Sequence, residues 1–287
     1  MSAQPAPRRI WLCADDYGIS PGVNRAILAL IARGRLNATS VMMVGPAIGR
    51  DDAQALLDAA PDRARCAIGL HATVTAPFHP LTTAFQPVDG GMFLPLPRML
   101  RASLLRQLDT EMIRAEIDAQ IAAFTALFGR PPDYVDGHQH AQLFPQVRDA
   151  VIGAVKAAAP QAWLRQCGRV QPLMQRLAMP KALLLDVLSG GFRRRADAAG
   201  LAVNPAFAGA YDFTRPSDFP ALMAGFLDGL PEGGLVMCHP GFVDDVLRHL
   251  DPLTDQRARE YAFLAGDGFA ALLAERQVDL ALPPLPR

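Results

Sequence analysis

Short apolar runs alternate along the chain with longer segments that place apolar residues at helical spacing. Apolar runs at 10–14, 39–44 and 66–71 are separated by segments with helical periodicity at 21–33 and 49–59. This strand, helix, strand order is typical of a parallel sheet that is covered by helices. The pattern therefore predicts a protein of the α/β class.

The same alternation continues through the second half of the chain. The segment DTEMIRAEIDAQIAAFTALF at 109–128 has acids in its first turn, and Gly129 and Pro131 follow its last apolar residue, which indicates a helix and its end. Later strands are expected at DYV, AWLRQ, GLVMC and VDLALP, and later helices at 145–158, 217–229 and 256–274. Seven or eight such units predict a (β/α) barrel, irregular or seven-stranded, in a single catalytic domain over 1–287.

Two apolar segments interrupt this alternation. The segment 75–108 contains TAPFHPLTTAF and GGMFLPLPRML, and the segment 170–195 reads VQPLMQRLAMPKALLLDVLSGGFRRR. The first is longer than an ordinary connection between a strand and a helix, so we expect insertions here. Such an insertion can be a lid, a surface that contacts a membrane, or a part of the core.

Charge and cysteine content narrow the range of partners. The 28 basic and 28 acidic residues balance to a formal charge of zero, so we expect a small or neutral partner and no nucleic acid. The four cysteines (Cys13, Cys66, Cys167 and Cys238) form no CxxC pair and indicate buried reduced thiols. Few apolar residues precede Asp15, too few for a signal peptide or a membrane span. We expect a cytoplasmic protein, and the pattern leaves its oligomeric state open.

The uncommon polar residues follow successive predicted strands, each at the point where its strand ends. This set comprises Asp15, Asp16, His71, Asp136, His138, His140, Arg165 and His239. The carboxyl ends of parallel strands meet on one face of a barrel, so these side chains should lie close together. One carboxylate with two imidazoles suits one divalent metal, zinc first and magnesium or another divalent ion as alternatives. One of the adjacent aspartates would then bind metal, and its neighbour could act as a base.

Several of these residues also have a purely structural explanation. A histidine at a strand end is often only hydrogen-bonded, and His79 and His249 are expected to be surface or structural residues. Arg165 is either a surface charge or, at the mouth of the barrel, the partner of a carboxylate in bidentate geometry. Asp244, which precedes Asp245, either caps a helix or orients a catalytic imidazole.

Four motifs in a fixed order resemble the signatures of one protein family. CADDYGIS with VNRAI, then IGLHATVT, DGHQHAQLFP and MCHPGFVDD are similar to those of the YdjC-like carbohydrate deacetylases, the ChbG group, over about 8–275. NPAFAGAYDF and GGLVMCHPGFVDDVLRHLDPLTDQRAREYAFL most resemble its hopanoid-biosynthesis-associated HpnK branch. The resemblance implies a metal-dependent N-deacetylase that removes acetate from an N-acetylglucosaminyl hopanoid or, alternatively, from soluble chitooligosaccharides.

Carried over residue by residue, the resemblance implies roles for six residues. The metal ligands would be Asp16, His71 and His138, the general base Asp15 with Arg165 in support, and the general acid His239. Supporting positions are expected at His140, Asp136 and Asp244. Relatives often carry a third histidine two positions beyond His140, where this chain has Gln142. That departure affects the roles of Gln142 and His140 but leaves the metal triad intact.

Two other functions compete with this interpretation. A phosphoesterase on the same barrel would need a second metal or more basic groups than Arg165 alone. A non-catalytic glycolipid-binding protein on a retired enzyme scaffold would be expected to lack the base or a ligand, and neither is missing. We therefore expect an amphiphilic glycolipid or amino-sugar substrate. The apolar residues around Phe93, Leu94, Met99 and Leu100 are expected to cradle the lipid, to contact the inner face of a membrane, or to pack in the core.

Overall fold

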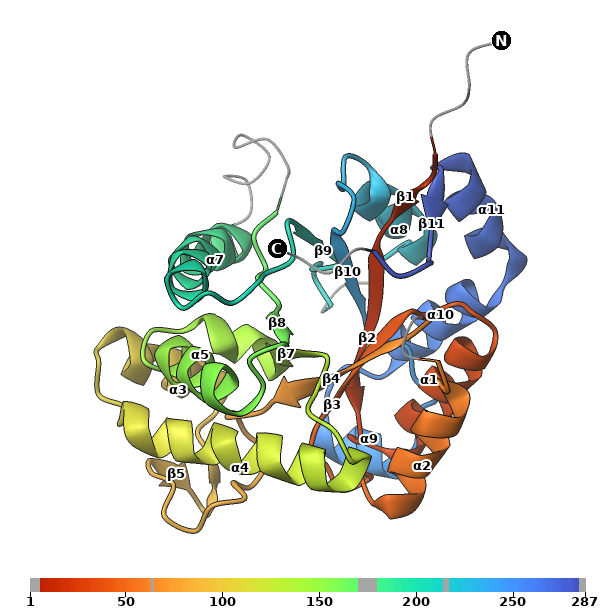
Figure 1. Ribbon diagram of the computed structural model, residues 1–287. Coiled ribbons are helices and arrows are strands. Elements are labelled where there is room, and N and C mark those ends of the chain that lie inside the picture. The colour runs from red at the N-terminus through yellow and green to blue at the C-terminus, as the bar shows by residue number, and fades with distance from the viewer. Residues whose placement is uncertain (1–5, 63–64, 170–179, 214–216, 284–287) are drawn as a thin grey trace.

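The computed structural model describes residues 6–62, 65–169, 180–213 and 217–283. Its main sheet has seven parallel strands in the order β8-β7-β4-β3-β2-β10-β9 (Figure 1). These strands are β2 (Trp11–Tyr17), β3 (Ala38–Val41), β4 (Ala67–Ala72), β7 (Tyr134–Gly137), β8 (Trp163–Leu164), β9 (Phe207–Ala208) and β10 (Leu235–Cys238). The predicted α/β class and the parallel sheet are confirmed.

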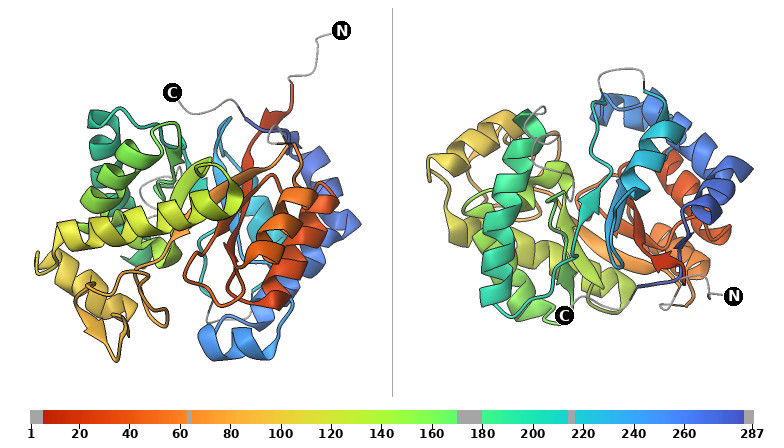
Figure 2. Two further views of the ribbon diagram at one scale, coloured as in Figure 1. Left: turned by 60° about the horizontal axis from the view of Figure 1, so that its bottom comes forward. Right: turned by 90° about the horizontal axis from the view of Figure 1, so that it is seen from above.

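Helices lie outside the curled sheet, which is seen along the strands in the right panel of Figure 2. They are α1 (Pro21–Ala32), α2 (Arg50–Ala59), α3 (Leu96–Leu104), α4 (Thr110–Phe128), α5 (Val147–Ala158), α7 (Pro180–Ala198), α8 (Phe219–Leu227), α9 (Asp245–Leu250), α10 (Asp255–Ala265) and α11 (Asp267–Glu275). The single helix predicted over 256–274 is wrong, because Gly266 adopts an extended conformation that ends α10 and caps α11. Glycine gives up helical geometry at little cost.

The two edges of the sheet approach each other through the segment that precedes β9. Leu164 forms a parallel bridge with Val203, and the Asn204 side chain accepts the Gln166 N–H at 2.8 Å and donates to the Gln166 carbonyl at 3.1 Å. An amide side chain thus supplies the hydrogen bonds that a longer strand would make. The predicted irregular, seven-stranded barrel is confirmed.

Two short pairs of strands lie outside the main sheet. The predicted last strand exists as β11 (Val278–Asp279), but it pairs with β1 (Arg8–Arg9) rather than extending the barrel. The strands β5 (Val88–Asp89) and β6 (Met92–Phe93) form a hairpin within the 75–108 insertion. Its two turn residues, Gly90 and Gly91, have φ of 60° and 82°, which only glycine adopts without strain.

Local sequence fixes the ends of the helices that flank the barrel. Ser20 accepts a hydrogen bond from the Val23 N–H at the start of α1, and Asp109 accepts two at the start of α4. Gly129 ends α4 in the left-handed conformation, with φ of 69°. These caps satisfy backbone groups that the helix leaves unpaired, so the predicted helix at 109–128 is confirmed almost to the residue.

The apolar residues of the 75–108 insertion belong to the core. Phe93, Leu94 and Met99 are buried, and Leu100 packs against the core. Of the roles expected for this segment, packing in the core is therefore the one that these residues take. Of the 170–195 segment, residues 170–179 lie outside the described part and the rest belongs to α7.

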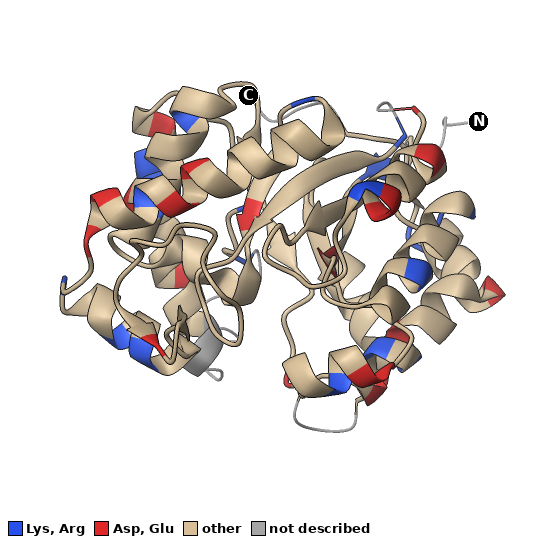
Figure 3. Ribbon diagram, turned by 90° about the horizontal axis from the view of Figure 1, so that it is seen from below, with Lys and Arg blue, Asp and Glu red and all other residues tan. Residues whose placement is uncertain are grey.

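Charges of both signs are interspersed along the helices in the view of Figure 3. Among the described residues, no helix combines the length and the apolar character that crossing a bilayer requires.

Candidate metal centre

The adjacent acids Asp15 and Asp16 lie near the carboxyl end of β2, a strand whose residues are all buried. The pairing of β2 with β3 shifts register between Ala14 and Tyr17, and Asp16 has a φ of 69°. This left-handed conformation is uncommon for a residue with a side chain and is typical of functional sites. Asp15 and Asp16 consequently bind different partners, although they are neighbours in the chain.

The structure brings together the three residues expected to bind metal. Asp16 Oδ1 lies 3.2 Å from Nε2 of His71, which belongs to β4, and 3.1 Å from Nδ1 of His138, which follows β7. All three side chains are buried, and their ligand atoms lie within 4.8 Å of one another. One oxygen and two nitrogens at these positions fit three ligands of a divalent cation.

Asp136 orients His71. Its Oδ1 lies 2.6 Å from Nδ1 of His71, which directs Nε2 of the same ring towards Asp16. A carboxylate behind a ligating histidine fixes the ring and its tautomer. Burial alone would lower the pKa of His71, but Asp136 and Asp15 outweigh it and raise the pKa to about 10. The surroundings of this imidazole therefore favour a positive charge.

Asp15 and Arg165 form a buried bidentate ion pair. Nη1 of Arg165 donates to Oδ2 of Asp15 at 2.7 Å and Nη2 donates to Oδ1 at 2.6 Å. Burial would raise the pKa of Asp15, but the guanidinium outweighs it and holds that pKa well below its usual range. Arg165 is fully buried, which excludes the surface-charge interpretation.

A second cluster of potential metal ligands already contains a cation of the protein. Cys13, Asp15 and Asp136 lie close enough to share an ion. Nη2 of Arg165, however, lies 2.9 Å from the Cys13 Sγ, 2.6 Å from Asp15 and 2.5 Å from Asp136 Oδ2. The guanidinium occupies the place that a metal would take.

Arg257, which the sequence analysis did not single out, holds the other oxygen of Asp16. Its Nη2 lies 2.5 Å from Asp16 Oδ2 and 2.6 Å from Asp251 Oδ2. The segment DQRAREY looks like a polar surface helix, yet Arg257, Glu260 and Leu264 form a buried stripe on α10. The helical spacing of these three positions, which places them on one face of the helix, was the one feature of the sequence that could have indicated a buried face.

His239 lies at the end of β10 and is held through its backbone. Its N–H donates to Glu260 Oε2 at 2.5 Å, and the Tyr211 hydroxyl donates to the other Glu260 oxygen at 2.6 Å. The Phe213 ring meets the imidazole edge to face, with 5.3 Å between centroids. Nδ1 of His239 is buried and has no hydrogen-bond partner within the described part of the chain. Burial lowers the pKa of His239.

Of the three residues expected to support the site, Asp136 contacts a proposed ligand, and His140 and Asp244 make other contacts. Asp136 contacts His71, as described above, whereas Nδ1 of His140 lies 3.4 Å from the Cys167 Sγ. Burial lowers the pKa of His140 to about 3. Asp244 caps α9 by accepting the Leu247 N–H at 2.8 Å, which corresponds to the first of its two expected roles.

The two histidines expected at the surface, His79 and His249, are exposed. Gln142, at the position of the relatives' third histidine, is buried.

The buried charges around the triad favour a divalent cation. Four carboxylates share two guanidiniums through direct ion pairs: Asp15, Asp16, Asp136 and Asp251 with Arg165 and Arg257. With neutral imidazoles the cluster has a formal charge of −2, which a divalent cation would neutralise. Because an uncompensated buried charge is costly, this balance fits the donor set of the triad.

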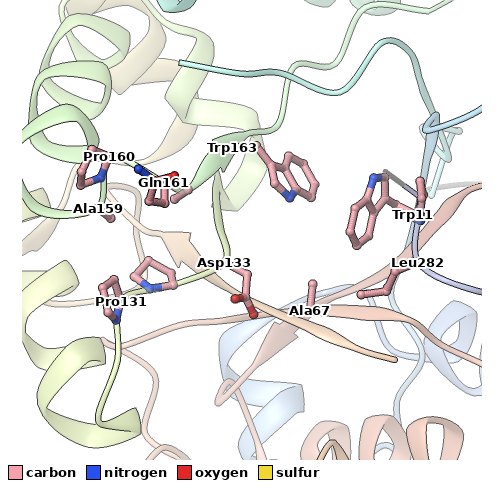
Figure 4. A pocket seen from close by; sticks show the side chains of 12 residues that line it. Trp11, Ala67, Pro131, Asp133, Ala159, Pro160, Gln161, Trp163 and Leu282 are labelled. Carbon is pink, nitrogen blue, oxygen red and sulfur yellow. The ribbon is translucent and has the colours of Figure 1, made fainter. Parts of the chain in front are cut away.

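A cavity of about 550 Å³ lies at the opposite end of the barrel (Figure 4). Its lining includes Trp11, Ala67 and Trp163, the first residues of β2, β4 and β8, and the two indole rings are 5.2 Å apart between centroids. It is thus separated from the carboxyl-end cluster by the length of the strands.

Comparison with known proteins identifies the family of this chain. Residues 9–275 match the family described as YdjC-like protein. A curated relative, the chitooligosaccharide deacetylase of Escherichia fergusonii, is 27% identical over 250 residues, which cover 82% of each chain.

Two solved structures share the fold. The "putative cellobiose-phosphate cleavage protein" of Enterococcus faecalis has a TM-score of 0.74 at 20% identity and covers 96% of this chain and 98% of its own. The lactam utilization protein of Thermus thermophilus has a TM-score of 0.51 at 16% identity, with coverage of 96% and 99%. The family match spans most of the chain and includes the whole cluster around the triad, and the protein therefore belongs to the YdjC-like family.

Proposed function

We propose that this protein is a metal-dependent N-deacetylase that hydrolyses the acetamide of an N-acetylglucosamine-type sugar. The observation that carries the proposal is the buried triad of Asp16, His71 and His138 beside the ionised Asp15. Membership of the YdjC-like family and the chitooligosaccharide deacetylase among its relatives support the same chemistry.

Three atoms would hold the metal: Asp16 Oδ1, His71 Nε2 and His138 Nδ1. When bound, a divalent cation supplies polarisation of the acetamide carbonyl and acidification of a water molecule. Zinc is the first choice, because one carboxylate and two imidazoles are ligands that it prefers, and magnesium or another divalent ion is the alternative.

Asp15 is proposed as the general base. Arg165 keeps it ionised, and Oδ2, which among the described residues accepts only from Nη1 of Arg165, retains a lone pair. Asp15 takes a proton from the attacking water as the new C–O bond forms at the acetamide carbon. Arg165 fixes the direction of the carboxylate and does not exchange a proton itself.

His239 is proposed as the general acid. As the C–N bond breaks, the imidazolium gives its proton to the departing nitrogen, and the products are acetate and a free amine. Burial lowers the pKa of His239, which makes the imidazolium a stronger acid. Glu260 and Phe213 fix the backbone and the ring of this residue.

The arrangement of the arginines argues against phosphoester hydrolysis. Arg165 and Arg257 are fully buried, and both bind carboxylates of the protein. Neither guanidinium is therefore available to a phosphate, which usually binds basic groups or a second metal. A non-catalytic binding protein would not require the ionised Asp15 beside the triad.

For the substrate itself we favour an amphiphilic N-acetylglucosaminyl lipid, of the hopanoid type that the HpnK-like motifs imply. Half-buried Phe213, from the stretch NPAFAGAYDF, packs against the His239 ring, and half-buried Tyr211 packs on Phe213, which offers an apolar surface near the proposed general acid. Contact with a membrane would involve three exposed leucines of the insertion, Leu81, Leu104 and Leu105. Soluble chitooligosaccharides are the alternative substrate.

Acetate release tests the proposal. Purified protein is treated with chelator and assayed with and without added zinc on an alkyl N-acetylglucosaminide and on diacetylchitobiose. We expect release that chelator abolishes and zinc restores, with higher kcat/KM for the alkyl glycoside. Equal kcat/KM on both substrates would refute the lipid preference alone. Absence of release with any divalent metal would refute the deacetylase.

A further inference from the structure

We infer that Arg257 is a positioning residue that directs Asp16 Oδ1 towards the two histidines by holding Oδ2 of the same carboxylate. The inference rests on the proposed function, because it assumes that the triad binds metal. It assigns to α10, a helix that contributes none of the three proposed ligands, a direct effect on metal affinity.

The geometry of Asp16 divides its two oxygens between different partners. Oδ1 lies 3.1 and 3.2 Å from the two imidazole nitrogens, and Oδ2 lies 2.5 Å from Nη2 of Arg257. With Oδ2 held by a charged donor, only Oδ1 is directed at the metal position, so the carboxylate binds through one atom. Hydrogen bonds to a ligating carboxylate restrict its orientation and typically affect metal affinity.

Arg257 is itself fixed by three contacts besides Asp16. Its Nη2 also binds Asp251 at 2.6 Å, its Nε donates to the Leu253 carbonyl at 3.0 Å, and its own carbonyl accepts the Gly241 N–H at 3.1 Å. The side chain is fully buried. A long side chain held at both ends loses little further freedom when the metal binds, which suits it to positioning.

A side chain at residue 241 would crowd Arg257. A Cβ atom there would lie 3.3 Å from Cβ and Cδ of Arg257 and 3.0 Å from Cγ2 of Val23. Gly241 lies two residues after His239. Arg257 therefore connects the metal-ligand end of β2 with the loop that carries the proposed general acid.

A second role for Arg257 predicts the opposite effect on metal. If the guanidinium only competed with the cation for the charge of Asp16, its removal would strengthen zinc binding. If it positions Asp16, its removal weakens zinc binding. The sign of the change in zinc affinity separates the two roles.

The experiment measures the zinc dissociation constant by competition with a chromophoric chelator, well below the melting temperature of each variant. We expect Arg257→Met to bind zinc about 10- to 100-fold more weakly than the original protein. Arg257→Lys keeps the charge but loses the hydrogen bond from Nε to the Leu253 carbonyl, so its affinity should lie between those of Arg257→Met and the original protein. Arg259→Met, an exposed arginine on the same helix, is the matched control and should bind zinc normally.

Asp251→Asn provides a test if Arg257→Met does not fold. It leaves Arg257 and Asp16 in place and removes the charge of the carboxylate that anchors the guanidinium, so a several-fold loss of zinc affinity is expected. A lower melting temperature with unchanged zinc affinity in both Asp251→Asn and Arg257→Lys would mean a purely structural role and overturn the inference.

His71→Ala separates failure of this inference from failure of the proposed function. Loss of zinc in His71→Ala together with normal or tighter binding in Arg257→Met would overturn the role of Arg257 and leave the metal site standing. Normal zinc binding in both variants would mean that the triad is not the metal site.

Discussion

The guanidinium of Arg165 holds the carboxylate of Asp15 through two hydrogen bonds of 2.6 and 2.7 Å, across 150 positions of sequence. Asp16, the next residue, is held by a different arginine, Arg257. Two adjacent acids can therefore be buried at the end of one strand, because each is paired with a different buried arginine. The same pairing keeps Asp15 ionised, as a base must be.

Asp15→Asn should abolish most turnover while the metal stays bound. The amide cannot take up a proton from water, so kcat for acetate release should fall by about 10²- to 10⁴-fold. The zinc dissociation constant should stay within a few-fold of the original, because Asp15 is not a member of the triad. Asp58→Asn, an exposed acid on α2, is the control. Loss of zinc in parallel with turnover would contradict the separate roles of the two aspartates.

His71→Ala and His138→Ala should lose zinc before anything else. Each removes one of three protein ligands, so zinc affinity should fall by at least the 10- to 100-fold range that even supporting residues produce. Metal content after dialysis and chelator competition measure this effect, with exposed His249→Ala as the control. A variant that retained stoichiometric zinc but lost turnover would indicate a catalytic rather than a ligating histidine.

His239→Ala should discriminate between leaving groups. An amine must be protonated as it departs, whereas p-nitrophenolate leaves without a proton. Acetate release from the acetamide should therefore fall by about 10²-fold or more, while hydrolysis of p-nitrophenyl acetate should fall much less. Equal losses on the two substrates would show that His239 acts on binding or on the attack step instead.

Glu260→Gln should change how stability depends on pH. Burial raises the pKa of Glu260 from 4.5 to about 7, even though Tyr211 and the His239 N–H lower it. Between these pH values the folded protein keeps a proton on Glu260 that the unfolded chain releases, so rising pH favours unfolding. The stability that this proton contributes is completely lost above about pH 7. Urea unfolding from about pH 5 to pH 8 should show Glu260→Gln gaining stability relative to the original protein, by on the order of 3 kcal/mol.

Protonation of Asp15 and Asp16 at low pH destabilises both proteins equally. It therefore cancels in the difference between their free energies of unfolding. A difference in unfolding free energy that stays constant with pH would mean that Glu260 is ionised throughout.

The residues that end buried strands were predictable, and those on helices were not. Asp15, Asp16, His71 and His138 follow short apolar runs, so the rule that parallel strands end on one face was enough to group them. Arg257 and Glu260 lie on α10, where a charged residue normally faces solvent. Only the three-dimensional packing of α10 against the barrel makes them internal.

Apolar composition alone could not place the 75–108 insertion. A run of Phe, Leu and Met has the same pattern in a core, a lid or a membrane-contacting surface, since each removes apolar area from water. The hairpin with Gly90 and Gly91 turns this segment back on itself and buries Phe93. The seventh strand, β9, was also missed, because two residues are too few to show a period.

The ion pair between Asp16 and Arg257 joins residues 241 positions apart, one near the beginning of the chain and one near its end. During synthesis β2, which carries Asp16, is made long before Arg257, the arginine that pairs with Asp16. Asp16 therefore cannot take its final, buried and ionised place until α10 has left the ribosome and docked. Completion of the metal centre is consequently a late event, which follows the synthesis of β10, the last strand of the main sheet to be made.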